Sequence, residues 1–255
     1  MLEKLRGVDG YLSDDEAWAL YVAARGRKRI VEIGSYKGRS TIAIGSALAD
    51  RGNGTLVSID PHRPTGKASY AREHGDLDTR AEFEGNVARA GVAAYVTPMH
   101  ATSLEARAAY DMQPIDMLFV DGSHDYEDVL ADIDAWTPLL SAGAVAAFND
   151  PYGPGVNRAL RERLLGGGVT YSEFRHVNNT LFALANAQRS SSIRERLALK
   201  AYLYVERMRF KLLKLTLKGL FEALGIVYVR PDALRSLGDR GGKVFSAGQA
   251  STEIL

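Results

Sequence analysis

The sequence predicts an α/β fold in which a mostly parallel sheet is covered by helices on both faces. Three observations support this prediction. Short apolar runs alternate with amphipathic segments along residues 28–186, as in repeated strand–helix–strand units. The run at 116–120 (DMLFV) is almost wholly apolar, which is expected of a strand buried on both faces. A glycine-rich turn follows the first run, and such turns favour a ligand site at the strand tips.

Residues 1–27 precede this alternation and are predicted to be a helical segment. Ser13 stands three residues before Glu16, which is the spacing of a capping box at the start of a helix. The first strand–helix–strand unit then covers IVEIGSYKGRSTIAIGSALADRGNGTLVSID, and its last residue is Asp60. Its predicted elements are a strand at 29–33, a helix at 39–49 and a strand at 55–59.

The rest of the alternating region predicts five more strands and three more helices. The residues 141–143 (SAG) are expected to end the second of these helices. The polar, Pro- and Gly-containing stretch 61–78 is expected to be either a lid over the site or a solvated loop, and a lid is the preferred interpretation. The predicted strands are 93–97, 116–120, 144–148, 169–175 and 179–185, and the predicted helices are 103–110, 126–140 and 156–165.

The turn after the first strand has the spacing E-x-G-x-x-x-G, from Glu32 to Gly38. A dinucleotide-binding turn would have a glycine at position 32, and a carboxylate there would repel a pyrophosphate. The same carboxylate would suit the cationic amino group of a methionine moiety. This spacing resembles motif I of the class I S-adenosylmethionine (SAM) methyltransferases. The resemblance implies that SAM is bound by Glu32, Gly34, Ser35, Gly38 and Ser40, with Asp60 at the ribose hydroxyls.

A second group of polar residues follows the strands at 116–120 and 144–148. Asp121 ends one strand and the pair Asn149-Asp150 ends the other, so we expect these side chains to meet at one edge of a parallel sheet. Oxygen ligands of this kind suit a divalent cation such as Mg²⁺ or Mn²⁺. His124 lies three residues after Asp121 and can face the same cavity. Taken singly, these residues could instead be ordinary helix-cap or turn residues.

The segments DGSHDY (121–126) and N-D-x-x-x-x-G-V (149–156) resemble a branch of the class I methyltransferases. Its members modify sugars and macrolide sugars and are related to the catechol O-methyltransferases. The resemblance implies a Rossmann-like fold with a seven-stranded sheet, extending over 28–186. It also implies a metal held by Asp121, Asn149 and Asp150, although catechol-type enzymes have this last pair in the reverse order. It further implies His124 as the general base, with Asp121 beside it, and Thr102 and Ser103 at the adenine.

From these residues we expect a metal-dependent SAM O-methyltransferase acting on a hydroxyl of a saccharide or glycosylated metabolite. Three alternatives stay open. A phenolic or catechol acceptor would present the same features at the site. An NAD-type oxidoreductase is opposed by Glu32 and by the missing third glycine. A SAM-binding protein without turnover is opposed by the presence of Asp121, His124 and Asp150.

The C-terminal part, 187–255, is predicted to be a basic helical extension and tail. It carries 13 Lys or Arg against 6 Asp or Glu, so its net charge is +7 and that of 1–186 is −6. Apolar and basic stripes at helical spacing run along 193–224. We expect this helix to pack on its own domain or in a homodimer, with contact to an anionic membrane surface or to an anionic or carbohydrate chain as alternatives. Nucleic acid is not an expected partner, because no recognisable module is present.

The composition is that of an ordinary globular protein. The chain has no cysteine, which excludes disulfides and thiolate chemistry. Its first residues lack the apolar run of a signal peptide, and no apolar stretch reaches the roughly 18 residues expected of a membrane span. These features lead us to expect a cytoplasmic enzyme.

Overall fold

The structure is a computed structural model of the whole chain, and it divides into two compact units, Met1–Arg209 and Phe210–Leu255. All that follows concerns the first unit. This unit ends at Arg209, whereas the predicted alternating region ends at residue 186. Residues 64–76 of the expected lid (61–78) and most of the expected helix 193–224 lie outside the described residues. The structure describes residues 1–63, 77–166, 169–186, 192–194, 197–205, 208 and 212.

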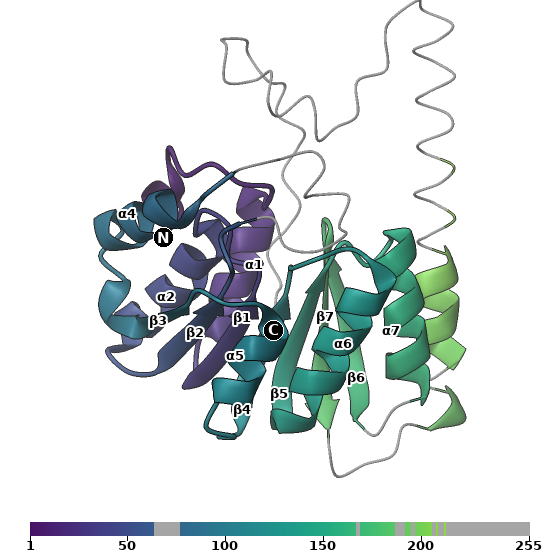
Figure 1. Cartoon of the computed structure of the whole chain (residues 1–255). Helices are drawn as coiled ribbons and strands as arrows, with labels where there is room; N and C mark the ends of the chain where they lie inside the picture. Colours follow the sequence, from purple (N-terminus) through teal and green to yellow (C-terminus); the bar gives the residue numbers. More distant parts are fainter. Residues whose placement is uncertain are drawn as a thin grey trace, which may run out of the picture. The chain divides into compact units, whose positions relative to one another are not determined.

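A single seven-stranded sheet forms the centre of this unit, which confirms the predicted fold class (Figure 1). The strand order is β3-β2-β1-β4-β5-β7-β6. The first five strands in this order are parallel, and β7 runs antiparallel to both of its neighbours. The strands are β1 (Arg29–Ile33), β2 (Thr55–Ile59), β3 (Val96–Met99), β4 (Ile115–Val120), β5 (Leu140–Asn149), β6 (Thr170–Val177) and β7 (Thr180–Asn186).

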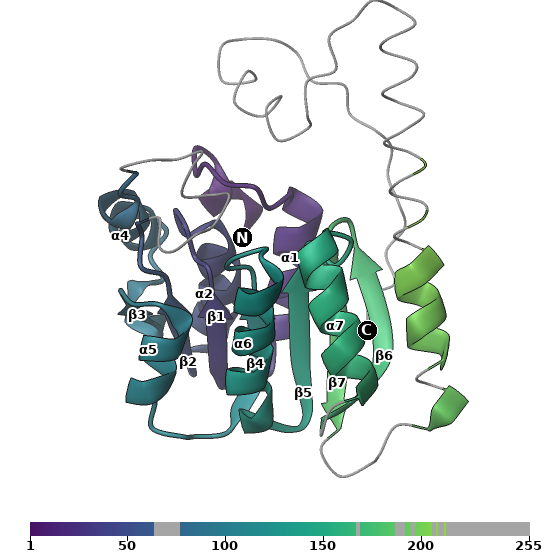
Figure 2. The ribbon, with the colours of Figure 1, turned by 45° about the vertical axis from the view of Figure 1, so that its right-hand side comes forward.

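Helices cover both faces of the sheet (Figures 1 and 2). One apolar core joins the sheet to α1, α2 and α4, and the other joins it to α5, α6 and α7. Neighbouring residues of one strand belong to different cores: Leu118 belongs to one and Phe119 to the other. This alternation follows from the period of two in a strand. The helices are α1 (Asp14–Ala24), α2 (Arg39–Arg51), α4 (Arg80–Arg89), α5 (Ser103–Ala109), α6 (Tyr126–Trp136) and α7 (Pro154–Gly166), with short 3₁₀ turns at η1 (Leu2–Leu5), η2 (Ala93–Tyr95) and η3 (Thr137–Leu139).

Three predicted boundaries were wrong. The third strand begins at Val96, because residues 93–95 form the 3₁₀ turn η2. The helix expected to reach residue 140 ends at Trp136, where the Pro-containing turn η3 replaces it. The residues 141–143 do not separate helix from strand but lie within β5. There the pairing with β4 shifts register and Gly143 takes a left-handed φ of 75°, as a glycine can in a bulge. Helix α4 had not been predicted.

The N-terminal segment is fastened to the start of α2. The predicted capping box is present, with Ser13 accepting a hydrogen bond from the Glu16 N–H. Ahead of it, the Arg39 guanidinium donates to the backbone carbonyls of Leu5, Val8 and Leu12 at 2.7–3.2 Å. Only η1 and α1 of the first 27 residues are helical. This segment therefore packs against the helix that follows the predicted cofactor turn.

Beyond β7, residues 197–205 are helical and pack on the sheet domain. Leu199 and Leu203, which belong to the predicted apolar stripe, are buried in the core that contains α6 and α7. The described part of the stripe thus packs on its own domain, which is one of the arrangements expected from the sequence. Within the described part of the chain, no helix is long and apolar enough to cross a membrane.

Candidate functional site

The turn between β1 and α2 lies at the switch point of the sheet, where β1 separates β2 from β4. Gly34 has a φ of 88°, and a Cβ there would lie 2.1 Å from the Asp121 carbonyl oxygen. Gly38 has a φ of 91°, and a Cβ there would lie 3.2 Å from the Phe83 ring. Both glycines are therefore required by positive φ and by close packing against the protein itself. This packing brings the predicted cofactor turn directly against the tip of β4.

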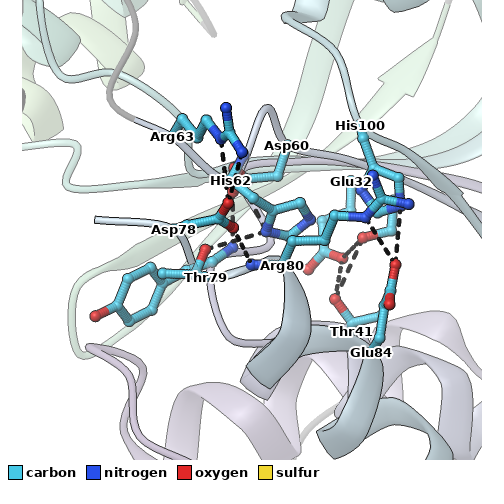
Figure 3. A network of polar contacts seen from close by, with 12 residues as sticks. Glu32, Thr41, Asp60, His62, Arg63, Asp78, Thr79, Arg80, Glu84 and His100 are labelled. Atoms are coloured by element: carbon cyan, nitrogen blue, oxygen red, sulfur yellow. Dashed lines mark hydrogen bonds and ion pairs between the residues drawn. The ribbon is translucent and has the colours of Figure 1, made fainter. Parts of the chain in front are cut away.

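Glu32 is fully buried beneath this turn (Figure 3). Its Oε2 accepts hydrogen bonds from the hydroxyls of Thr41 at 2.5 Å and Ser58 at 2.9 Å. Among the residues that the structure describes, neither its Oε1 nor the buried Ser35 hydroxyl has a hydrogen-bond partner. Burial raises the pKa of Glu32 to about 7, although the Ser40, Thr41 and Ser58 hydroxyls lower it. A buried carboxylate with a free oxygen fits a cationic partner such as the SAM amino group.

Asp60 ends β2 and holds the two adjoining loops in place. Its two oxygens accept the backbone N–H groups of Tyr36 at 2.7 Å and His62 at 2.6 Å. Each carboxylate oxygen has a second lone pair, so ribose hydroxyls could still be accepted. Asp60 thus lies at the strand tip where the sequence placed it, next to the turn that carries Gly34.

His62 closes the base of the segment expected to form a lid (Figure 3). It is buried, its Nδ1 lies 3.1 Å from the Thr79 hydroxyl, and its carbonyl accepts the Thr79 N–H. Burial lowers the pKa of its imidazole despite the nearby Asp60 carboxylate. Arg63 and Asp78 form a two-pronged ion pair beside it, at 2.9 and 3.1 Å. The two ends of the segment are therefore fastened together, and His62 is a structural residue.

Thr102 and Ser103, which the resemblance placed at the adenine, have partners within the protein. Thr102 caps α5 by accepting the Glu105 N–H, and its own hydroxyl donates to the Glu105 carboxylate at 2.7 Å. The Ser103 hydroxyl accepts a hydrogen bond from the Trp136 indole at 2.9 Å. Both residues stand just after β3, where they were expected, but their hydroxyls are used to fix α5 and α6.

The second constellation comes together at the tips of β4 and β5. His124 Nε2 lies 3.2 Å from Asp150 Oδ2 and 3.9 Å from Asp121 Oδ1. The His124 side chain is half exposed, so a substrate can approach its ring. Asp121 follows the strand next to β1, and its carbonyl touches Gly34. The imidazole therefore lies between two carboxylates, beside the predicted cofactor turn.

These groups change one another's proton affinity. Burial raises the pKa of Asp121 to about 6, against the lowering effect of the nearby His124 imidazole. Burial acts to lower the pKa of His124, but the neighbouring Asp121 and Asp150 carboxylates outweigh it and raise that pKa above its usual value of 6.5. Perturbed groups that converge in this way are typical of catalytic sites.

The predicted metal ligands do not form a cation site as arranged. The Asn149 amide donates to the Thr180 hydroxyl at 3.3 Å, which turns it toward β7. The imidazole of His124 stands between Asp121 and Asp150, where a shared cation would have to lie. Among the residues that the structure describes, no three His, Cys, Asp or Glu side chains are grouped to hold a metal ion. The donor geometry thus supports proton transfer through His124 and gives no support to Mg²⁺ or Mn²⁺.

Sequence reasoning missed a chain of hydrogen bonds that holds Asp150. The Asn179 amide donates to Asp150 Oδ1, and the Asn179 carbonyl accepts the Asp150 N–H at 2.9 Å. The buried Glu16 accepts in turn the Asn179 N–H and the Thr180 hydroxyl, each at 3.0 Å. Glu16 gave only a capping signal in the sequence. Its second role could not be found there, because its partners are more than 160 residues away.

Gly155 fixes the segment that carries His124. A Cβ at Gly155 would lie 2.2 Å from the His124 carbonyl oxygen and 2.9 Å from the Tyr126 nitrogen. This glycine was part of the N-D-x-x-x-x-G-V pattern, but nothing in the pattern showed what it touches. Its contact brings the start of α7 against the loop between β4 and α6.

Comparisons with known proteins point to one class. Residues 31–151, just under half of the chain, match a family described as a methyltransferase domain. The O-methyltransferase TomG from Streptomyces achromogenes, involved in tomaymycin synthesis and solved with SAM, has a similar structure: 23% identity, a TM-score of 0.53, and coverage of 72% of this chain and 86% of TomG.

Two further solved structures agree. An O-methyltransferase from Bacillus cereus, in complex with SAH, shares 18% identity with a TM-score of 0.51, covering 72% of this chain and 86% of its own. The O-methyltransferase NovP shares 15% identity with a TM-score of 0.58, covering 68% and 80%. The fold is that of the class I methyltransferases. This fold and the match over residues 31–151 agree with the predicted enzyme class, a SAM-dependent methyltransferase.

Proposed function

We propose that this chain is an O-methyltransferase that methylates a hydroxyl of a saccharide or glycosylated metabolite, with His124 as the general base. The observation that carries the proposal is the position of the His124 imidazole, 3.2 Å from Asp150 and 3.9 Å from Asp121 at the tips of β4 and β5. The three solved O-methyltransferases of the same fold support transfer to oxygen. The saccharide acceptor rests on the DGSHDY and N-D-x-x-x-x-G-V segments.

Bound SAM supplies a methyl group on a positively charged sulfur, which is an electrophile that needs no covalent enzyme intermediate. Glu32, Gly34, Ser35, Ser40, Gly38 and Asp60 would hold it, as the unpartnered Glu32 Oε1 and Ser35 hydroxyl suggest. His124 takes the acceptor hydroxyl proton as the new C–O bond forms. The methyl–sulfur bond breaks with its electron pair on sulfur, so the products are the methyl ether, SAH and one proton on His124. Asp121 and Asp150 stabilise the resulting imidazolium.

The acceptor could instead be phenolic, which was the first alternative from the sequence. A phenol has a pKa of about 10 and ionises far more readily than a sugar hydroxyl. An imidazole held between two carboxylates is a stronger base than a free imidazole. Deprotonating a sugar hydroxyl requires a stronger base than deprotonating a phenol. The raised pKa of His124 makes it a stronger base for either acceptor, so the saccharide is preferred on the sequence segments alone.

Replacing the base is the decisive experiment. We expect His124→Ala to lower kcat by roughly 10²–10⁴-fold, the usual contribution of a general base, while the affinity for SAH stays within about twofold. The measurement is turnover with a panel of sugars and phenols, together with calorimetric titration by SAH and, as control, NAD(H). Full activity of the variant would remove His124 from the mechanism. Binding of NAD(H) in place of SAH would instead favour the oxidoreductase alternative.

Treatment with a chelator tests separately whether turnover depends on a metal ion. Because the imidazole stands between the two carboxylates, we expect turnover to be unchanged after EDTA treatment and gel filtration. The measurement is kcat before and after treatment, and again with added Mg²⁺ or Mn²⁺. Loss of turnover that added metal restores would show that Asp121 and Asp150 rearrange around a cation, as the sequence suggested.

A further inference from the structure

One predicted feature is not used by the proposed reaction, namely the basic stripe of 193–224. Its described member Lys200 lines a cleft between the start of α6, one side of α7 and the helix 197–205 (Figure 2 shows α6 and α7). The cleft has a volume of about 750 Å³, which is within the range of small-molecule sites. Its polar lining residues are Tyr126, Arg158, Arg161, Glu162 and Lys200.

The charge of this cleft is positive. It is lined by three cations, Arg158, Arg161 and Lys200, and by one acid, Glu162. The acid is already engaged, because its two oxygens accept the Tyr126 hydroxyl at 2.6 Å and the Arg163 guanidinium at 3.0 Å. Within the described residues, neither Arg161 nor Lys200 forms an ion pair. The cleft therefore offers cationic donors that its own acid does not neutralise.

One of these cations is held in place. The Arg158 guanidinium lies 3.8 Å from the centre of the Tyr126 ring, in a cation–π contact. The Tyr126 ring is itself fixed by its hydroxyl bond to Glu162. A stacked guanidinium keeps its N–H groups for hydrogen bonding, and its fork matches a phosphate or carboxylate. This arrangement loses less side-chain entropy on binding an anion than a free arginine would.

The cleft also borders the loop that carries the proposed base. Gly155 lines it, and a Cβ there would lie 2.2 Å from the His124 carbonyl oxygen. Tyr126, which lines it as well, is only two residues from His124. A molecule that reaches from His124 into this cleft would therefore meet its cations with any anionic group that it carries.

We propose that this cleft binds the phosphate or carboxylate group of an anionic acceptor, so that the acceptor is an acidic or phosphorylated saccharide derivative. Anion binding by the cleft is inferred from its lining residues alone. That the anion belongs to the acceptor rests on the proposed function. A free phosphate in solution would satisfy the same groups, and the experiment separates these two sources.

The first measurement tests the cleft without any turnover. The full-length protein is titrated with inorganic phosphate at low ionic strength, and the arginine side-chain NMR signals are followed. We expect binding with a Kd on the order of 1 mM, weakened at least tenfold in the double variant Arg161→Ala/Lys200→Ala. The control Arg25→Ala/Arg51→Ala removes the same charge from exposed positions elsewhere and should bind like the parent. Unchanged binding in the first variant, or equal weakening in both, would overturn the proposal.

The second measurement assigns the anion. Turnover is compared for a sugar phosphate and its uncharged parent sugar, with the same two double variants. We expect Arg161→Ala/Lys200→Ala to raise KM about tenfold for the phosphorylated acceptor alone, with SAH affinity unchanged. Equal KM values for the two acceptors in the parent protein would overturn the acceptor assignment. If no acceptor is methylated at all, the proposed function fails, while the phosphate titration still decides whether the cleft binds anions.

Discussion

At Gly34, the residue that suggested a cofactor turn is fixed by the protein before any ligand binds. Its φ is positive, and an added Cβ would lie only 2.1 Å from the Asp121 carbonyl oxygen, so there is no room for a side chain. Glu32 shows the opposite case, because its buried Oε1 has no hydrogen-bond partner among the described residues. For Gly34 the requirement for glycine includes packing against the protein itself. The unpartnered oxygen of Glu32, like the unpartnered Ser35 hydroxyl, instead points to a ligand.

The pH dependence of turnover should reveal the state of His124. The base must be neutral, so activity should rise with pH through the His124 pKa, which the neighbouring carboxylates raise above 6.5. In Asp150→Asn one of these charges is absent, and the rise should move to lower pH. Asparagine also tolerates the positive φ of 51° at this position. The measurement is kcat/KM against pH for both proteins, and identical profiles would contradict the role of Asp150.

At the scale of elements, the turn between β6 and β7 supports the site from outside it. Its Asn179 holds Asp150, and α1 holds Asn179 through Glu16. Because β7 pairs with β5, this turn lies beside the tip of the strand that ends in Asp150. The N-terminal helix is thus linked to the proposed base through part-buried hydrogen bonds from Glu16 to Asn179 and from Asn179 to Asp150, which lies beside His124.

Removing the Asn179 amide should disturb both stability and chemistry. Asn179→Ala breaks a hydrogen bond to a charged group, so we expect a loss of about 1.5–3 kcal/mol in the free energy of unfolding. Because Asp150 is then less well held, the pH profile of kcat/KM should shift as well. Denaturant unfolding and the pH profile are the two measurements.

The neighbouring Asn178 offers a matched control for that variant. Its amide donates to Ser13 at 3.0 Å, and its φ of 46° is one that glycine adopts freely. Asn178→Gly should therefore leave the pH profile unchanged. A stability loss in Asn179→Ala without any shift of the profile would show that Asn179 is merely structural.

At the scale of the whole molecule, the sheet order brings distant segments together at one edge. Strands β1, β4 and β5 are neighbours, so Gly34, Asp121 and Asp150 meet although they are far apart in sequence. The prediction that strand tips converge was confirmed because parallel strands share one carboxyl edge. The predicted metal site gains no support, for a reason that the sheet order could not reveal: the side chain of Asn149 bonds to Thr180 on β7.

The sequence by itself determined the strand–helix alternation, the sheet class, and the placement of Asp121, His124 and Asp150 at the ends of neighbouring strands. These follow from local spacing, because the periods of strands and helices and the place of a residue at a strand end are properties of short segments. Only the tertiary structure decided that β7 lies between β5 and β6, that Glu16 and Asn179 support Asp150, and that Arg158, Arg161 and Lys200 share a cleft. These facts depend on side chains that meet across long stretches of chain, and local patterns carry no record of which distant residues will become neighbours.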